Sequence, residues 1–327
     1  MASLTLLDVG HGSCALLQSG DEHVLIDAGP GTSCLELLRE RGLDSIGVVL
    51  LSHADSDHLK GLIELIGAGV DVSEVLLNTD SLKGSKVWDA LLWELDQRER
   101  HGTLRFEVAL VEGLELRPGN GKITVRVLAP RRYLAALGPG SEEKHGRRLE
   151  TNTVSAVVRI ERDGEPLILL TGDLDSLGLE YLLETGMDLR ARVLVYPHHG
   201  GRSGSDTRKF ARELVTRVQP DMVAFSIGRG RFATPRPEVI ETIRQVSPEI
   251  RIACTQLSEH CAESLPLEEP VHLSASFSAG RRSRTCCAGT LVFNLGDRSV
   301  EPIPDAHRAF IRRWATTALC QRIPVSL

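Results

Sequence analysis

Short apolar segments separated by turn residues dominate the first fifty residues of the chain. Segments of this length, rich in Val, Leu and Ile, are typical of β-strands. The expected strands are residues 4–9, 13–18 and 23–27, and the turn Gly29-Pro30-Gly31 follows the third of them. A fourth apolar segment, residues 48–52, predicts a buried strand that leads directly to His53.

Helical spacing begins after this strand, where Leu and Ile side chains repeat along one face of residues 59–66. Further helices are expected near residues 33–41, 86–99, 205–218 and 238–246. Further strands are expected at residues 105–111, 123–128, 154–160, 167–171, 193–197 and 222–226, and residues 138–148 are expected to form a mobile loop. Strands and helices that interleave without a regular βαβ repeat favour a layered α/β sandwich over a doubly wound sheet.

The composition changes after residue 250. Residues 1–250 are expected to form the main domain, and residues 251–327 a C-terminal extension or subdomain. The second part contains Cys254, Cys261, Cys286 and Cys287. These thiols could form a structural zinc site, but their spacing is not that of a standard zinc finger. Buried, reduced core cysteines are the alternative.

The overall composition narrows the class of protein. Charged residues make up 25% of the 327 residues and the net charge is −6, which argues against a basic protein that coats nucleic acid. An enzyme that contacts nucleic acid through a local patch stays compatible with these values. The sequence shows no apolar run of about 18 residues and no signal-peptide pattern, so we expect no membrane segment. The seven cysteines do not resemble a disulfide framework, which predicts a cytoplasmic location.

The densest group of reactive side chains is His53-Ala54-Asp55-Ser56-Asp57-His58. This group follows a strand and opens a helix, so two imidazoles and two carboxylates must share one small volume. They would repel one another or stay unpaired unless a cation compensated them. A divalent metal ion is the simplest solution, and a second ion would let all four side chains act as ligands. A solvated polar loop is the alternative.

Three other segments place complementary side chains at strand ends. Thr171-Gly172-Asp173 puts a carboxylate after an apolar strand, and Pro197-His198-His199-Gly200 puts two neighbouring imidazoles in the same kind of position. Asp27 ends a third strand, and we expect it to orient a metal ligand rather than to bind the ion itself.

These four segments, in this order, resemble the metallo-β-lactamase superfamily over residues 4–245. The chain is most similar to the nuclease-like domain of the ComEC competence proteins. That group shares Asp8-Val9-Gly10, the His-x-Asp-x-Asp-His motif and an Asn-x-x-Ser segment, here Asn152-Thr153-Val154-Ser155. The resemblance implies a four-layer αββα sandwich, followed here by the C-terminal extension.

Two positions depart from the competence-type pattern. Gly10-His11-Gly12-Ser13 stands where those sequences usually have Gly-Gln-Gly-Asp, and Thr234 stands where a final metal-binding His is expected. The change at Thr234 leaves three interpretations open. A second metal ion is held more loosely, His198 or His199 takes over as the ligand, or the site is inactive.

The resemblance also implies a ligand set. His53 and Asp55 would hold one metal ion, Asp57 and His58 would hold the other, and Asp173 would bridge the two ions. His198 is a further expected ligand. One or two ions of Zn²⁺ or Mn²⁺ are expected. Imidazole ligands suit zinc, whereas the carboxylates are not the soft ligands of a purely soft site and also suit manganese.

The expected catalytic residues are Asp57, Asn152 and His199. A metal-activated hydroxide would be the nucleophile. If His199 is not a ligand, it is placed to protonate the leaving group.

The substrate class is predicted from the surroundings of this site. Between Gly200 and Arg236, eight basic residues outnumber three acidic ones. Arg202, Arg229 and Arg231 fall in loops expected to flank the metal site, where guanidinium groups suit a phosphodiester substrate. The basic residues of the intervening helix are expected on its solvated face.

We therefore expect a metal-dependent phosphodiesterase that acts as a nuclease on DNA or RNA. A second hypothesis is hydrolysis of a small phosphodiester, or a lactamase-, thioesterase- or glyoxalase-type reaction. A third is a non-catalytic subunit that uses this fold for assembly with partner subunits or with copies of itself. The missing His at position 234 gives the third hypothesis some support.

Overall fold

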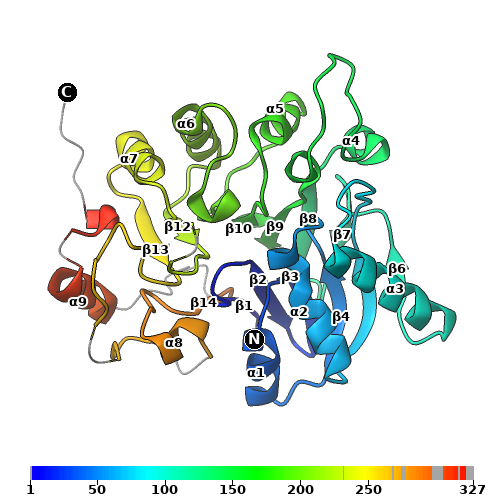
Figure 1. Cartoon of the computed structure of the whole chain (residues 1–327), viewed down its shortest axis with the longest axis horizontal. Helices are drawn as coiled ribbons and strands as arrows, with labels where there is room; N and C mark the ends of the chain where they lie inside the picture. Colours follow the sequence, from blue (N-terminus) through cyan, green and yellow to red (C-terminus); the bar gives the residue numbers. More distant parts are fainter. Residues whose placement is uncertain are drawn as a thin grey trace.

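The computed structural model describes residues 2–230, 232–266, 269–273, 277–296, 305–315 and 317–321. Within these residues, the strands form two seven-stranded sheets (Figure 1). Buried apolar side chains of both sheets meet in one cluster, which includes Leu4 and Ile26 from the first sheet and Val158 and Ile168 from the second. The two sheets therefore pack face to face around a shared core.

The first sheet has the order β14-β1-β2-β3-β4-β5-β6. Its strands are β1 (Ala2–Leu6), β2 (Cys14–Ser19), β3 (Glu22–Ala28), β4 (Ser45–Leu50), β5 (Asp71–Leu76), β6 (Arg105–Glu107) and β14 (Leu291–Asn294). Strands β3 to β6 pair in parallel, whereas β14, β1, β2 and β3 pair antiparallel. The residues that follow β3 and β4 consequently emerge at the same edge of the sheet.

The second sheet has the order β13-β12-β11-β10-β9-β8-β7. Its strands are β7 (Glu115–Leu116), β8 (Ile123–Ala129), β9 (Val157–Arg162), β10 (Glu165–Leu170), β11 (Val193–Val195), β12 (Met222–Phe225) and β13 (Arg251–Cys254). Strands β10 to β13 are parallel. The last four residues of β10 are all buried, because this sheet is covered on both faces.

Helices cover the outer face of each sheet. Helices α1 (Ser33–Glu40), α2 (Ser56–Gly67) and α3 (Lys86–Arg100) pack on the first sheet. Helices α5 (Ser176–Glu184), α6 (Thr207–Val218), α7 (Pro237–Val246) and α9 (Asp305–Trp314) pack on the second. The short elements are α4 (Arg132–Leu137), α8 (Ala279–Ser283), η1 (Thr151–Val154), η2 (Pro197–Gly200) and η3 (Leu319–Gln321). The expected αββα sandwich is confirmed.

Helix α6 illustrates how local sequence sets these elements. The side chain of Asp206 accepts a hydrogen bond from the backbone N–H of Lys209 at 2.9 Å, which caps the helix N-terminus. Phe210 and Leu214 are buried, while Arg208 lies on the outer side and pairs with Glu241 of α7 at 2.8 Å. The basic residues of this helix thus lie on a solvated face, as expected.

Several element boundaries differ from the expected ones. Helix α2 begins at Ser56, three residues before the apolar repeat, so Asp57 and His58 lie in its first turn. Strand β9 begins at Val157, and the residues before it form η1. Strand β5 and helix α5 had no clear apolar pattern and were not expected.

Residues 138–148 do not behave as the mobile loop that their polarity suggested. Glu143 is buried and accepts hydrogen bonds from Tyr181 and, at 3.0 Å, from Arg147. Arg147 also pairs with Glu180 at 2.8 Å. A buried carboxylate with these partners ties the segment to α5.

The boundary expected at residue 250 cuts through the second sheet, where β12 and β13 pair. Strand β14 also completes the edge of the first sheet, beside β1. Buried Asp8 strengthens this link, because its carboxylate accepts hydrogen bonds from Gln256, Ser278 and Gly280. Residues after 250 are therefore built into both sheets of the sandwich rather than appended to it.

No helix in the described part of the chain is long and apolar enough to cross a membrane.

Candidate metal centre

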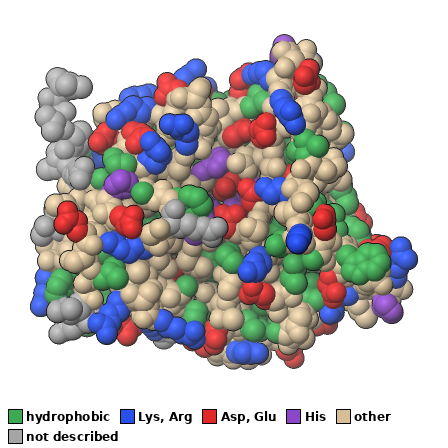
Figure 2. Space-filling view, in the orientation of Figure 1, with side chains coloured by type: hydrophobic (Ala, Val, Ile, Leu, Met, Phe, Trp, Pro, Cys, Tyr) green, Lys and Arg blue, Asp and Glu red, His purple; other side chains and the backbone are tan. Residues whose placement is uncertain are grey.

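The predicted site residues meet where several strands of the two sheets end. Strand β4 leads to His53 and Asp55, β10 leads to Asp173, and β11 leads to His198 and His199 in η2. Figure 2 shows histidine and acidic side chains gathered near the middle of this face of the molecule. Sequence reasoning therefore located these side chains correctly: at the carboxyl ends of strands from both sheets.

Asp173 lies at the centre of this group, and its two carboxylate oxygens face different imidazoles. Oδ1 lies 3.3 Å from Nε2 of His58 and 3.9 Å from Nε2 of His199. Oδ2 lies 3.5 Å from Nδ1 of His198 and 3.9 Å from Nε2 of His53. Asp173 thus faces all four imidazoles, and two of them, His53 and His58, also lie close together, with ring centroids 4.1 Å apart and donor atoms within 4.8 Å of each other and of Asp173.

Two further carboxylates complete these groups. Asp55 Oδ2 lies 3.6 Å from Nε2 of His53, and Asp57 Oδ2 lies 3.3 Å from Nε2 of His199. We call the first set, His53, Asp55 and His198, position A. We call the second set, Asp57, His58 and His199, position B. Asp173 faces imidazoles of both sets. The division of these ligands between two ions stays a prediction from the resemblance.

The chemistry of these atoms fits a divalent metal ion. Four buried imidazole Nε2 atoms have no hydrogen-bond partner among the described residues: those of His53, His58, His198 and His199. The separations of 3.3 to 3.9 Å are long for hydrogen bonds between ring nitrogens and carboxylates. Two ligand atoms on one tetrahedral ion, at bond lengths of about 2.0–2.1 Å, lie about 3.4 Å apart. The residues therefore fit the group that their motif implies.

Asp27 orients the ring of His58 through its Nδ1 atom. Its Oδ2 lies 2.7 Å from Nδ1 of His58, and its carboxylate also accepts hydrogen bonds from the backbone N–H and hydroxyl of Ser52 at 2.7 and 2.9 Å. This pairing leaves Nε2 of His58 directed at Asp173. Asp27 has a positive φ of 58°, a sparsely populated conformation that proteins retain mainly at functional sites.

His199 is oriented in a similar way. Its Nδ1 donates a hydrogen bond to the carbonyl oxygen of Ser226 at 2.7 Å, so Nε2 carries the lone pair and faces Asp57. His198 and His199 both have positive φ, 52° and 55°. This geometry favours His199 as a ligand over its alternative expected role as the proton donor.

The carboxylates stay ionised in this cluster. Burial alone would raise the pKa of Asp173, but the imidazoles of His58 and His199 outweigh it and hold the pKa well below its ordinary value. Burial lowers the pKa of His53 to about 4, and nearby His58 adds to the effect. At neutral pH, His53 is therefore neutral and able to bind a metal ion.

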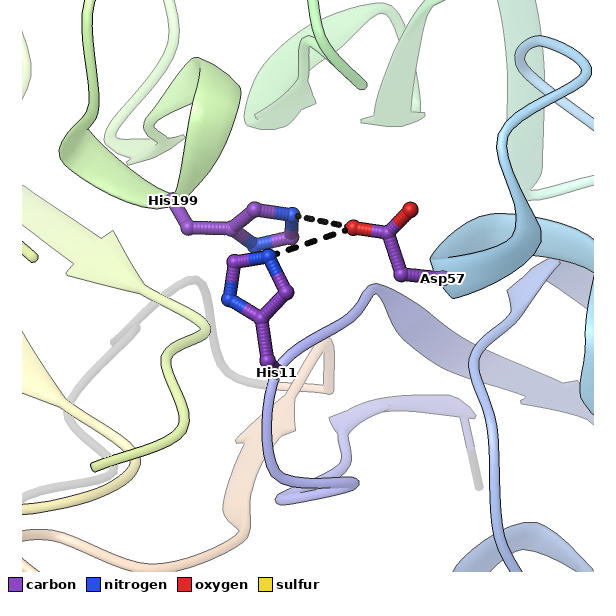
Figure 3. A group of neighbouring side chains, drawn as sticks. All are labelled: His11, Asp57 and His199. Atoms are coloured by element: carbon purple, nitrogen blue, oxygen red, sulfur yellow. Dashed lines mark ion pairs between the residues drawn. The ribbon is translucent and has the colours of Figure 1, made fainter. Parts of the chain in front are cut away.

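A side chain that sequence reasoning passed over also points into this centre. His11, from the loop between β1 and β2, lies with Nε2 3.4 Å from Oδ2 of Asp57, the same oxygen that faces His199 (Figure 3). The sequence contained one signal, the departure from the competence-type pattern at Gly10-His11-Gly12. A comparison with that pattern shows this departure only as a mismatch.

Residues 7–80 match the sequence profile described as "Metallo-beta-lactamase superfamily". The matched segment contains Asp27 and the whole cluster from His53 to His58. The sequence of residues 7–80 is thus similar to that superfamily.

Curated relatives of this chain include two competence-related proteins. Competence protein ComA of Neisseria gonorrhoeae is 27% identical over 262 residues, which cover 79% of this chain and 31% of the relative. ComE operon protein 3 of Bacillus subtilis is 23% identical over 218 residues, which cover 65% of this chain and 24% of the relative. The chain thus spans less than a third of the length of either one.

Among solved structures, unliganded yeast PDE1 has a TM-score of 0.50 with 13% sequence identity, covering 77% of this chain and 97% of that chain. At this identity the likeness supports the fold alone.

Asn152, an expected catalytic residue, lies in η1, and its Oδ1 is buried with no hydrogen-bond partner among the described residues. The nearby Ser155 makes the recorded contacts with the centre. Its hydroxyl lies 3.4 Å from Nδ1 of His53 and accepts a hydrogen bond from the backbone N–H of Asp173 at 3.0 Å. A catalytic role for Asn152 stays a prediction.

The three expected substrate-binding arginines have different surroundings. Arg229 was wrongly placed at the substrate, because its guanidinium donates hydrogen bonds to the carbonyls of Leu257 and Ala262 at 2.8 and 2.7 Å. Arg202 is exposed just after η2, where it can meet a ligand. Arg231 lies outside the described residues.

Lys83 adds a cation that no sequence motif predicted. It lies in the segment between β5 and α3, and its ammonium group pairs with Asp55 of position A. Burial lowers its pKa.

Of the expected zinc set, Cys254, Cys261 and Cys287 line one small pocket, whereas Cys286 lies apart from it. Cys286 Sγ lies 3.6 Å from Oδ2 of Asp8, whereas Cys287 Sγ lies 3.4 Å from Nε2 of His307. In the described part of the chain, the groups whose donor atoms lie close enough to share an ion contain only His and Asp. The thiols are buried, and burial raises the pKa of Cys254, which fits the alternative of reduced core cysteines.

Thr234 is buried next to Gly201, and its Oγ1 has no hydrogen-bond partner among the described residues. Nε2 of His199 lies 3.3 Å from Oδ2 of Asp57. The three interpretations of the departure at Thr234 therefore stay open.

Proposed function

We propose that this chain is a metal-dependent hydrolase whose substrates are phosphodiesters, with nucleic acid as the main class. The observation that supports it most is the position of Asp173, whose two oxygens face separate imidazole groups. Two divalent ions bridged in this way are characteristic of sites that cleave phosphodiesters.

The residues of the chain supply the scaffold for this chemistry. Position A would hold one ion through His53, Asp55 and His198, and position B the other through Asp57, His58 and His199. Asp27 and Ser226 fix the orientation of two of these imidazoles. When bound, the ions would lower the pKa of water toward 7 and take up negative charge on a phosphoryl oxygen.

Two cations at the mouth of the site support an anionic substrate. Lys83 lies beside Asp55, and Arg202 is exposed directly after His198 and His199. When Asp55 binds an ion, the ammonium group of Lys83 becomes available to a phosphate. The chain carries a net charge of −6, so its contact with nucleic acid would be local rather than extensive.

The similarity to competence-related proteins supports nucleic acid over a small molecule. The proposal concerns this domain alone, because the relatives are more than three times as long as the matched segment.

The test is a substrate panel with the purified chain and added Mn²⁺ or Zn²⁺. The panel contains single- and double-stranded DNA, RNA, bis-p-nitrophenyl phosphate and a β-lactam. We expect cleavage of at least one nucleic acid, lost on chelation and in Asp173→Asn. The matched control is Asp188→Asn, a surface acid paired with Arg190, which should cleave like the wild type.

Three results would contradict the proposal. Cleavage that survives in Asp173→Asn would show that the centre is not the active site. Hydrolysis of the β-lactam alone would show that phosphodiesters are not the substrate class. No turnover of any substrate by the metal-loaded chain would favour the non-catalytic hypothesis.

A further inference from the structure

We propose that His11 is a ligand of the metal ion at position B, together with Asp57 and His199. This inference rests on the proposed metal-dependent function and adds His11 to Asp57, His58, His199 and the shared Asp173, the side chains already expected there. It assigns the β1–β2 loop a direct part in metal binding.

The first support is the direction of the side chain. Nε2 of His11 lies 3.4 Å and Nε2 of His199 3.3 Å from the same oxygen, Oδ2 of Asp57 (Figure 3). These values match the separation of about 3.4 Å expected between two ligands of one tetrahedral ion. The donor atoms of the three residues all lie within 4.8 Å of one another. One ion can therefore contact all three without a large movement of the chain.

The second support is that the loop is built against helix α2. The backbone N–H of Ser13 donates a hydrogen bond to the carbonyl of Asp57 at 3.1 Å. Gly12 has a φ of +150°, and a Cβ at this position would lie 2.5 Å from the same carbonyl oxygen. Only glycine fits there, so the loop that carries His11 is held directly against the first turn that carries Asp57.

The third support is that one residue contacts both the loop of His11 and the ring of His199. Ser226 donates a hydrogen bond from its hydroxyl to the carbonyl of Gly12 at 2.6 Å, and its own carbonyl accepts one from Nδ1 of His199 at 2.7 Å. Gly228 lets the same segment pass close to the loop, because a Cβ there would lie 2.3 Å from the backbone nitrogen of His11. The segment after β12 therefore fixes His11 and His199 relative to each other.

The ring of His11 is also confined. Its centroid lies 4.4 Å from that of His199 and 4.4 Å from that of Phe232, and its side chain is only 11% exposed. A ring held in this way loses little conformational freedom when it binds an ion, which favours affinity.

A simpler role is an ion pair between protonated His11 and Asp57 that has no effect on metal binding. The two roles differ in what replacement of His11 does to the metal. If His11 is only an ion-pair partner, its replacement should leave binding of the second metal ion intact. If His11 is a ligand, its replacement should weaken that binding.

The experiment is a titration of the full-length chain with Co²⁺, followed by calorimetry and by the visible absorption of the bound ion. We compare the wild type with His11→Gln, and with His101→Gln as the matched control, an exposed histidine directly after α3. We expect two binding steps in the wild type and the control. In His11→Gln, the step that fills position B should weaken by about tenfold or more and its absorption band should change.

Unchanged affinities and spectrum in His11→Gln would overturn the role of His11 and leave the proposed function standing. Absence of any Co²⁺ binding by the wild type would overturn both. Should His11→Gln fail to fold, wild-type protein can be modified with diethyl pyrocarbonate. Protection of His11 by the second equivalent of Co²⁺ supports the assignment, and equal modification with one or two equivalents overturns it.

Discussion

Nδ1 of His58 lies 2.7 Å from Oδ2 of Asp27, at the buried base of the metal centre. This contact sets which nitrogen of His58 faces the ion position. Because Nδ1 is engaged by the carboxylate, Nε2 is directed at Asp173. A carboxylate behind an imidazole also makes it a stronger donor to a metal ion.

Replacement of Asp27 by Asn should therefore weaken metal binding while the ligands stay in place. We expect metal affinity to fall by about 10- to 100-fold, as is common for residues that orient a ligand. Calorimetric titration with Zn²⁺ measures this directly. Asp21→Asn, at an exposed site, is the control and should bind as the wild type does. Equal affinities in Asp27→Asn and the wild type would show that the contact has no role in metal binding.

Metal binding should depend on pH through His58. Burial opposes protonation of this ring, but the carboxylates of Asp173 and Asp27 outweigh burial and raise its pKa well above 6.5. At neutral pH the metal-free ring therefore carries a proton that must leave before Nε2 can bind an ion. Affinity should rise with pH and level off above the raised pKa. Calorimetry in buffers of different ionisation enthalpy should show proton release at pH 7, and identical enthalpies in all buffers would refute this.

Gly172 is expected to be essential for the position of Asp173. Its φ is +49°, and a Cβ there would lie 2.4 Å from Oγ of Ser155 and 2.9 Å from Oγ of Ser52. Gly172→Ala should lower the free energy of unfolding by about 1–3 kcal/mol and reduce metal affinity. Gly186 has a φ of +68° with nothing near its Cβ position, so Gly186→Ala isolates the backbone cost alone. In urea unfolding, Gly172→Ala should have a lower free energy of unfolding than Gly186→Ala. The reverse order would count against crowding at the Cβ position of residue 172.

Arg229 and Arg202 should differ in what their loss affects. Arg229 donates hydrogen bonds to backbone carbonyls of the C-terminal region, so Arg229→Ala should lower stability by about 1.5–3 kcal/mol. Arg202 is exposed and follows His199 by three residues, so we expect Arg202→Ala to weaken substrate binding and leave stability unchanged. Thermal unfolding and the KM for the cleaved substrate separate the two effects. An unchanged KM in Arg202→Ala would remove this residue from the substrate site.

The sequence predicts the ligands that follow parallel strands, and the reason is geometric. His53, Asp173 and His198 each come within a few residues of a buried apolar strand, and the carboxyl ends of such strands meet at one edge of a sheet. An apolar strand is easy to recognise, so its end is also easy to locate. The layered α/β class followed from the pattern of strands and helices, whereas the four-layer αββα arrangement was implied by the resemblance.

His11 could not be found in this way. It lies in a short antiparallel connection between two glycines, and its partner Asp57 is 46 positions away in the sequence, so no local pattern joins them. The surroundings of Arg229 were missed for a related reason, because the sequence places this residue in a loop but does not show that its guanidinium turns toward residues 257–262. Strand β14 pairs with β1 from the opposite end of the chain, which hid its place in the first sheet.

The most direct test of the account is the number of metal ions that bind one chain, measured by equilibrium dialysis against Zn²⁺ or Mn²⁺ and elemental analysis. Positions A and B, bridged by Asp173, predict close to two ions per chain in the wild type and one or none in Asp173→Asn. A wild-type chain that binds none would contradict the metal centre and with it the proposed hydrolase.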